Sequence, residues 1–299
     1  MMNSFKGYLI LRTKTGGNEM RLRKPEWIRV KMQGGRQSNK VNSLLSDLSL
    51  NTVCSEANCP NLMECFERGT ATFMILGKNC TRNCTFCNVT REMPDDLILD
   101  EPENVAKAVE KLNLKHAVIT SVTRDDLEDQ GANQFARVVE EIRKTTPEVS
   151  IELLIPDMQG NEELIQIILD SEPNILNHNV ETVPDLYDKV RPMAIFERSI
   201  RVLDYVKKTK PGMKTKSGIM LGLGETKEQV IDVLKRLREV DCDMLTLGQY
   251  LQPTTSHIDV VEYITPEQFD EYKEIALDMG FKRVASAPLV RSSYYAEDL

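Results

Sequence analysis

The sequence lacks the residue patterns that enzymes use for acid–base or nucleophilic catalysis. Its 299 residues include only three histidines, His116, His178 and His257, and no nucleophile motif is visible. An early glycine-rich loop of the kind that binds dinucleotides is also absent, which disfavours a Rossmann sheet. Candidate chemistry must therefore be sought in other residue types.

Long apolar runs are missing too. No stretch of about twenty apolar residues occurs, so we expect no membrane span. The first seventeen residues contain neither a long apolar run nor a small-residue cleavage site, so we expect no secretory signal. Hydrophobic residues make up 41% and charged residues 28% of the chain, as in soluble globular proteins. We therefore predict a cytoplasmic protein that keeps its thiols reduced.

Charge is distributed unevenly along the chain. Residues 1–40 carry ten basic and two acidic residues, whereas the remainder carries 28 basic and 44 acidic residues. Two interpretations stay open: the basic arm packs on its own acidic surface, or it meets an acidic macromolecule. No aromatic-rich basic motif appears and the acidic body would repel phosphates, so we expect no nucleic-acid partner.

Short apolar runs alternate with amphipathic segments from residue 71 onward. The expected strands cover residues 71–77, 116–122, 149–155, 174–180, 216–224 and 243–251, with one more at 281–289. The expected helices cover residues 102–113, 132–145, 161–171, 225–240 and 265–280. Such alternation implies a parallel sheet. We predict an α/β fold, an incomplete (β/α)6 barrel, although the pattern leaves a doubly wound sheet open.

Polar clusters follow the expected strands. They cover residues 80–87, 120–126, 156–157, 177–181, 222–225 and 248–254. In α/β barrels the chemistry lies on the loops at the carboxyl ends of the strands. One face of the barrel is therefore predicted to be an active site.

Six of the seven cysteines form two groups of three. Cys80, Cys84 and Cys87 stand in "CTRNCTFC", and Cys54, Cys59 and Cys65 stand in "CSEANCPNLMEC". Thiolates prefer soft metals, and a structural zinc site needs four closed ligands. A cubane iron–sulfur cluster held by three cysteines leaves one iron open for a small molecule. Iron–sulfur clusters are therefore favoured over zinc, while Cys242 is expected to be a small buried residue.

The spacing C-x3-C-x2-C, with Phe86 before its last cysteine, resembles the signature of the radical S-adenosylmethionine (SAM) enzymes. The resemblance implies a 4Fe–4S cluster on Cys80, Cys84 and Cys87 whose open iron binds SAM. It also implies that an electron from the cluster splits SAM into methionine and a 5′-deoxyadenosyl radical. That radical removes a hydrogen atom from an unactivated carbon, which needs a dry pocket rather than an acid or a base.

The group of Cys54, Cys59 and Cys65 and several further motifs resemble those of the lipoyl synthase family. These motifs are "RKPEW", "GTATFMILG", "TSVTRDDL", "NHNVET", "TKSGIMLGLGET", "MLTLGQYLQP" and "RSSYYA". The resemblance implies insertion of two sulfur atoms at carbons 6 and 8 of an octanoyl group held on a carrier protein or domain. It implies a second, auxiliary 4Fe–4S cluster on Cys54, Cys59 and Cys65 that donates the sulfur. An electron donor such as flavodoxin or ferredoxin and an iron–sulfur carrier are further implied partners.

The resemblance also implies roles for other residues. Expected SAM-binding residues are Phe86, Asn177, Asn179, Glu181, Gly222 and Glu225. Asn177 and Asn179 are chosen for their place near a strand end, where they could also merely satisfy loop backbone, and Glu225 also fits a mere helix cap. A serine of "RSSYYA" is implied as fourth ligand of the auxiliary cluster. We favour Ser293 over Ser292, because neighbours alternate in an extended tail and only one side chain can face the iron.

The predicted organisation has four parts. Residues 1–50 form a basic arm with little structure of its own, residues 51–70 hold the auxiliary cluster, residues 71–288 form the barrel, and residues 289–299 form a tail that closes over that cluster. The recognisable motifs begin near residue 21, which makes Met20 a candidate start. Another radical SAM sulfurtransferase, or a non-catalytic iron–sulfur or zinc protein, remains an alternative.

Overall fold

The fold is built on one eight-stranded sheet. The computed structural model describes residues 22–29, 35–68, 70–294 and 296. Its strands follow one another in chain order: β1 (Asn51–Thr52), β2 (Thr72–Ile75), β3 (His116–Ser121), β4 (Ser150–Leu154), β5 (Ile175–Asn177), β6 (Lys214–Leu221), β7 (Met244–Gln249) and β8 (Arg283–Ser286). Strands β2 to β8 are parallel, and β1 pairs antiparallel with β2. Within the described residues β8 does not pair back to β1, so the barrel is incomplete, as predicted.

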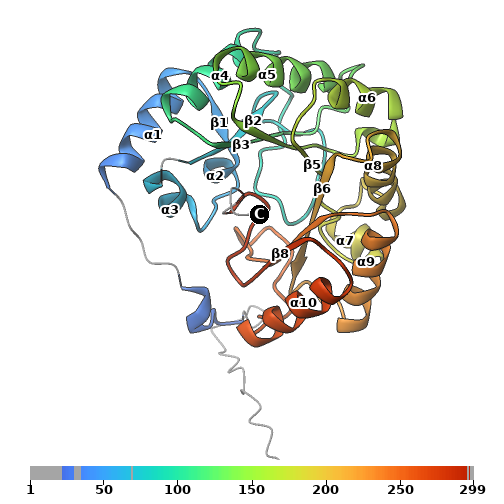
Figure 1. The fold of residues 1–299 in the computed structure, drawn as a ribbon. Coiled ribbons are helices and arrows are strands. Elements are labelled where there is room, and N and C mark those ends of the chain that lie inside the picture. Colours follow the sequence, from blue (N-terminus) through green and yellow to red (C-terminus); the bar gives the residue numbers. More distant parts are fainter. Residues whose placement is uncertain (1–21, 30–34, 69, 295, 297–299) are drawn as a thin grey trace, which may run out of the picture.

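Helices wrap the outside of the sheet (Figure 1). They are α4 (Glu101–Lys111), α5 (Ala132–Thr145), α6 (Glu162–Asp170), α7 (Tyr187–Val190), α8 (Phe196–Thr209), α9 (Lys227–Glu239) and α10 (Pro266–Asp278). Buried aliphatic side chains such as Ile119, Leu153 and Leu245 fill the space between strands and helices. Every predicted strand and helix of the barrel is confirmed, with bounds that agree to within three residues, and Cys242 is fully buried.

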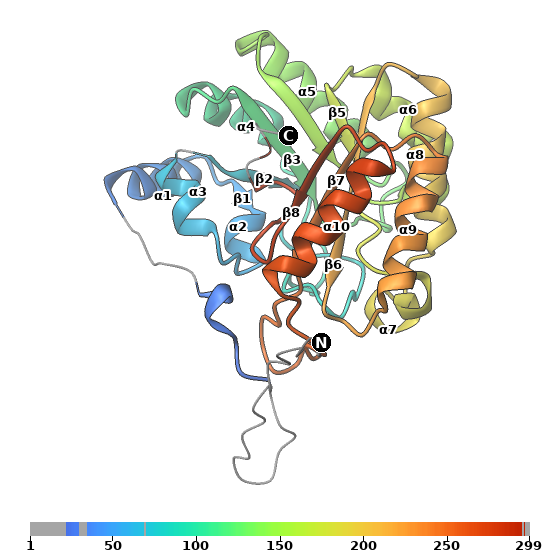
Figure 2. The ribbon, with the colours of Figure 1, turned by 60° about the horizontal axis from the view of Figure 1, so that its bottom comes forward.

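The arm predicted over residues 1–50, with little structure of its own, contains a helix in its last third that was not predicted. Helix α1 (Arg36–Asp47) buries Val41 and Leu45 in the main hydrophobic core and packs against α3 (Leu62–Glu67). Figure 2 shows α1, α2 (Val53–Glu56) and α3 grouped beside β1 and β2. A 3-10 turn over Glu26–Ile28 precedes them. Met20 and the residues before it lie outside the described part of the chain.

The helices of the described residues are all too short or too polar to cross a bilayer.

The parallel arrangement of the strands determines where the site lies. Because strands β2 to β7 run the same way, the loops that follow them meet at one end of the barrel. The loop with Cys80, Cys84 and Cys87 follows β2 at this end, whereas Cys54, Cys59 and Cys65 lie on the segment between β1 and β2.

Candidate functional site

A cavity of about 460 Å³ opens at the carboxyl ends of the strands. Five thiols line it, three from the loop after β2 and two from the segment around α2: Cys80, Cys84, Cys87, Cys54 and Cys59. Phe86, Asn179 and Glu181 line it as well. The fold therefore brings most of the predicted site residues together, although they lie far apart in the sequence.

The loop that carries Cys80, Cys84 and Cys87 is tied down on several sides. The Cys80 amide donates to the Thr90 carbonyl at 2.8 Å, and the Thr85 amide donates to the Val190 carbonyl at 2.9 Å. His257 Nε2 donates to the Cys87 carbonyl at 3.0 Å, from the loop after β7. The three side chains therefore sit on a fixed backbone rather than on a free loop.

The electrostatics of these thiols favour metal ligation. Burial raises the pKa of Cys87 to about 12 and also raises the pKa of Cys84, although Arg191 beside Cys84 opposes the shift. Thiolates need a nearby positive charge to form in such surroundings, and a bound metal supplies it. Seven cysteines are free, so the described structure contains no disulfide. The donor set thus fits an iron–sulfur cluster with one iron left open to the cavity.

The other triad lines a small pocket of about 30 Å³ that adjoins the cavity. Cys54 comes from α2, Cys65 comes from α3, and Cys59 lies between these helices. Burial, with repulsion from the neighbouring thiols, raises the pKa of Cys54 to about 11 and that of Cys65 to about 12. The thiols of Cys54, Cys59 and Cys65 therefore also suit a metal cluster.

No three His, Cys, Asp or Glu side chains among the described residues lie close enough together to hold a single metal ion. A cubane does not require such convergence, because it spreads its protein ligands over separate iron atoms.

The tail supplies the remaining wall of the small pocket. Ser293 lines it together with the three cysteines, and the Thr72 hydroxyl donates to Ser293 Oγ at 2.7 Å. Ser292 faces the other way, where its Oγ accepts from Asn179 Nδ2 at 2.7 Å. The Asn61 side chain donates to the Leu289 carbonyl at 2.8 Å and so fixes the tail to the cysteine segment.

Polar atoms without partners point to a ligand on the β5 side of the cavity. His178 donates from Nδ1 to the Ile155 carbonyl at 2.9 Å, which leaves Nε2 as a buried acceptor without a partner. Asn179 Oδ1 and Arg191 Nε are likewise buried and unpaired. Buried polar atoms are nearly always hydrogen-bonded, so a polar molecule such as SAM fits here. Gly218 leaves room beside Asn179, because a Cβ on Gly218 would collide with Asn179 Oδ1 and Thr246 Oγ1.

Three of the predicted SAM-binding residues do not line the cavity. Asn177 donates from Nδ2 to Glu152 at 2.7 Å inside the barrel, where Glu152 also pairs with Lys216. The Glu225 carboxylate accepts from the amides of Gly222 at 2.6 Å and Leu223 at 2.9 Å. Glu225 does not cap α9, since Thr226 occupies the N-cap position. These side chains shape the walls behind the cavity.

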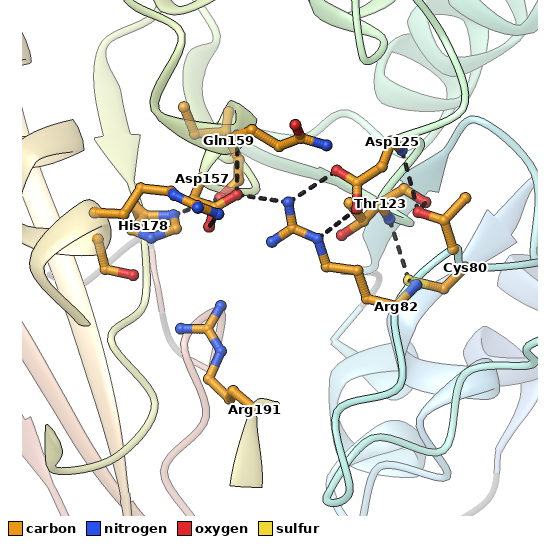
Figure 3. A network of polar contacts seen from close by, with 12 residues as sticks. Cys80, Arg82, Thr123, Asp125, Asp157, Gln159, His178 and Arg191 are labelled. Carbon is orange, nitrogen blue, oxygen red and sulfur yellow. Dashed lines mark hydrogen bonds and ion pairs between the residues drawn. The ribbon is translucent and has the colours of Figure 1, made fainter. Parts of the chain in front are cut away.

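Two arginines of the site were not expected from the sequence. Arg191 is buried beside Cys84 and Glu181 and donates from Nη1 to the Asn179 carbonyl at 3.1 Å. Arg82, inside the cysteine motif itself, is paired with acidic residues after β3 and β4 (Figure 3). Only long-range contacts reveal these roles, and no local pattern in the sequence signals them. Arg124, by contrast, pairs with Asp126, two residues away in the sequence.

Sequence profiles support what the geometry indicates. The radical SAM superfamily matches residues 74–237, and the N-terminal domain of lipoyl synthase of the radical SAM family matches residues 4–59. The second match begins upstream of Met20, the candidate start.

Curated relatives are similar over nearly their whole length. The chain is 54% identical to the lipoyl synthase of Caldanaerobacter subterraneus subsp. tengcongensis, over 93% of this chain and 97% of the relative. It is 54% identical to that of Caldicellulosiruptor saccharolyticus, over 93% and 98%. It is 55% identical to that of Alkaliphilus metalliredigens, over 92% and 95%.

Solved structures share the fold at low sequence identity. Methylornithine synthase matches with a TM-score of 0.56 and 17% identity, over 88% of this chain and 87% of that one. Streptococcus suis SuiB bound to S-adenosylmethionine matches with a TM-score of 0.57 and 13% identity, over 84% and 60%. The two thiol triads on one incomplete barrel, and the identity to curated relatives over nearly their full length, place this chain in the lipoyl synthase family of radical SAM enzymes.

Proposed function

We propose that the two cysteine triads divide the work of a lipoyl synthase between them. As a member of the family, the chain is a radical SAM sulfurtransferase that inserts sulfur at carbons 6 and 8 of a carrier-bound octanoyl group. In the proposal, Cys80, Cys84 and Cys87 hold the cluster that binds SAM, and Cys54, Cys59, Cys65 and Ser293 hold the auxiliary cluster. When bound, these clusters supply the electron that cleaves SAM and the sulfur that is inserted.

One observation carries this division: both thiol sets reach the same cavity. Cys54 and Cys59 line it on one side, and Cys80, Cys84 and Cys87 line it on another. A carbon radical formed in this cavity would meet the sulfur source without crossing solvent, which protects a reactive centre from side reactions. Phe86, Tyr250 and Val290 add apolar lining that excludes water.

The cavity walls have separate roles in the proposal. Asn179, Glu181 and the unpaired Nε2 of His178 bind SAM on the β5 side. Asn177, Gly222 and Glu225 do not line the cavity but support its walls. Glu225 fixes the turn after β6 by accepting hydrogen bonds from two backbone amides. Arg291, Ser293, Tyr294 and Ala296 of the tail complete the auxiliary pocket.

The substrate partner is an octanoylated carrier, and we propose that the basic N-terminal segment helps to dock it. Lys24 lines the cavity, so this segment reaches the entrance that a carrier-bound chain must use. Opposite charge on a carrier would steer its approach. A flavodoxin or ferredoxin as electron donor, an iron–sulfur carrier that restores the auxiliary cluster, and a cytoplasmic location belong to the same proposal.

The test is anaerobic incubation of the reconstituted chain with an octanoylated carrier, SAM and a reductant. Mass spectrometry should show the carrier gaining two sulfur atoms, with 5′-deoxyadenosine formed in parallel. Iron analysis should give about eight irons per chain, as two cubanes require. Zinc in place of iron would overturn the proposal, and sulfur transfer to a free small molecule but not to the carrier would favour another sulfurtransferase.

A further inference from the structure

Arg82 lies between two of the cysteines that face the cavity, yet its side chain is only 4% exposed. Its position in the cysteine motif, two residues from both Cys80 and Cys84, means that any force on its guanidinium acts on the loop between them. A buried arginine is rare unless it is paired, because removing its charge from water is costly.

The guanidinium joins this loop to two other strand ends (Figure 3). Its Nε and Nη2 donate to the two carboxylate oxygens of Asp125 at 2.7 and 2.8 Å. Nη2 also lies 2.7 Å from Asp157 Oδ1. Asp125 follows β3 and Asp157 follows β4, so one side chain ties the loop after β2 to the next two strands. The fork geometry with Asp125 is one that lysine cannot reproduce.

Backbone contacts run parallel to this pairing. The Thr81 amide and hydroxyl donate to the Thr123 carbonyl at 3.0 and 2.9 Å, and the Asp125 amide donates back to Thr81 Oγ1 at 3.1 Å. The Thr123 amide points at Cys80 Sγ from 3.4 Å. The β3 end thus fixes both the backbone and a sulfur of the motif.

We propose that Arg82 is a positioning residue, whose clamp on Asp125 and Asp157 sets where the cysteine loop presents its thiols relative to Asn179 and Glu181 across the cavity. The inference rests on the proposed function, in which those thiols hold the SAM-binding cluster. A buried ion network adds little net stability but can fix one geometry among several. Displacement of reacting groups by about 1 Å can cost about 100-fold in rate.

Arg198 provides a matched control. It approaches the same Asp157 carboxylate from α8, with Nη1 3.3 Å from Oδ2, but belongs to a helix outside the cysteine loop. Arg198→Met therefore removes a cation from the network without releasing the loop, whereas Arg82→Met removes a cation and the clamp together.

The experiment compares the reconstituted full chain with Arg82→Met, Arg82→Lys and Arg198→Met. Three quantities are measured: iron content, the change in the electron paramagnetic resonance spectrum of the reduced chain when SAM is added, and 5′-deoxyadenosine formation. Arg82→Met should retain at least about four irons per chain through its auxiliary triad. Its SAM-induced spectral change should weaken, and 5′-deoxyadenosine formation should fall about 10-fold to 100-fold. Arg82→Lys should recover part of both, and Arg198→Met should stay within about twofold of the unchanged chain.

The outcomes separate this inference from the proposed function. A wild-type chain without a SAM-induced spectral change would refute the proposed function itself. If the wild-type chain and Arg82→Met show the same SAM-induced spectral change, only the clamp is refuted. The clamp is also refuted if Arg198→Met loses as much of the spectral change and of 5′-deoxyadenosine formation as Arg82→Met. If Arg82→Met takes up no iron, Asp125→Asn decides, because it removes half of the clamp and leaves Asp157 for Arg82. Wild-type behaviour of Asp125→Asn in both assays would then overturn the inference.

Discussion

Ser292 and Ser293 are neighbours in the tail, yet their hydroxyls serve opposite sides of the cavity. Ser292 Oγ accepts from Asn179 at 2.7 Å, and Ser293 Oγ accepts from Thr72 at 2.7 Å beside the first cysteine triad. One tail segment therefore contacts both the proposed SAM site and the proposed auxiliary cluster.

The two serines should separate in function. Ser293→Ala is expected to form 5′-deoxyadenosine but to insert little sulfur, because only the auxiliary cluster loses a ligand. Ser293→Cys should keep that cluster yet stall transfer, since a thiolate leaves iron less readily than a serine oxygen. Chromatography of 5′-deoxyadenosine and mass spectrometry of the carrier measure the two steps. Full lipoyl formation by Ser293→Ala, with loss in Ser292→Ala, would assign the ligand to Ser292.

Substitutions in the two cysteine triads should affect different steps of the reaction. Cys84→Ala is expected to abolish SAM cleavage, and Cys59→Ala is expected to retain cleavage but to transfer no sulfur. Each variant should lose about four of about eight irons, because each pocket holds its own cluster. Iron analysis beside both product assays checks this. Intact SAM cleavage in Cys84→Ala would refute the assignment of the SAM-binding cluster to Cys80, Cys84 and Cys87.

Two glycines test the turn after β6. Gly222 has φ +96° and Gly224 has φ +112°, so alanine at either position costs about 1–2 kcal/mol of backbone strain. A Cβ on Gly222 would also collide with Gln249 Nε2 and the Glu262 carbonyl, whereas one on Gly224 keeps 3.6 Å from Val261. Gly222→Ala should therefore lower the free energy of unfolding by about 1–3 kcal/mol more than Gly224→Ala. Equal unfolding midpoints in denaturant would contradict the collision.

His178 should make stability depend on pH. Burial and the nearby Arg191 lower its pKa from 6.5 to about 4. Below pH 6.5 His178 binds a proton in the unfolded chain, whereas in the folded chain it binds one only below about pH 4. The free energy of unfolding therefore falls as the pH drops from 6.5 to 4. Between pH 7 and pH 5.5 the expected loss is about 1 kcal/mol. His178→Gln should show a shallower loss in denaturant unfolding, and identical slopes would refute the assignment.

The sequence was most informative where periodicity or spacing is local. Alternating apolar runs predicted the parallel strands, because each strand is buried on both faces. Cysteine spacing located both triads, since ligands of one cluster tend to lie on short loops.

Helix α1 was missed although its apolar residues follow helical spacing. Val41, Leu44, Leu45 and Leu48 recur at intervals of three and four, but the glycines before them and the polar surroundings suggested an arm. Packing against α3 supplies the stability that local propensity does not show.

The roles of Arg82 and Asn177 depend on contacts with residues 25 to 75 positions away. Asp125 and Asp157 fix the direction of the Arg82 side chain. Glu152 fixes the direction of the Asn177 side chain. Neither set of partners can be predicted from the residues next to Arg82 or Asn177 in the sequence. The motif therefore predicted that Asn177 belongs near the site but not that its side chain turns away from the cavity.

The hydrogen bond from Thr72 to Ser293 spans 221 positions, and this sets an order of events during synthesis. After Cys54, Cys59 and Cys65 have been synthesised, the ribosome must still translate the whole barrel before Ser293 can reach their pocket. The small pocket thus has no complete wall on a nascent chain. A cluster ligated by Ser293 would be installed only after translation has passed the tail, which makes its insertion a step for the nearly finished protein.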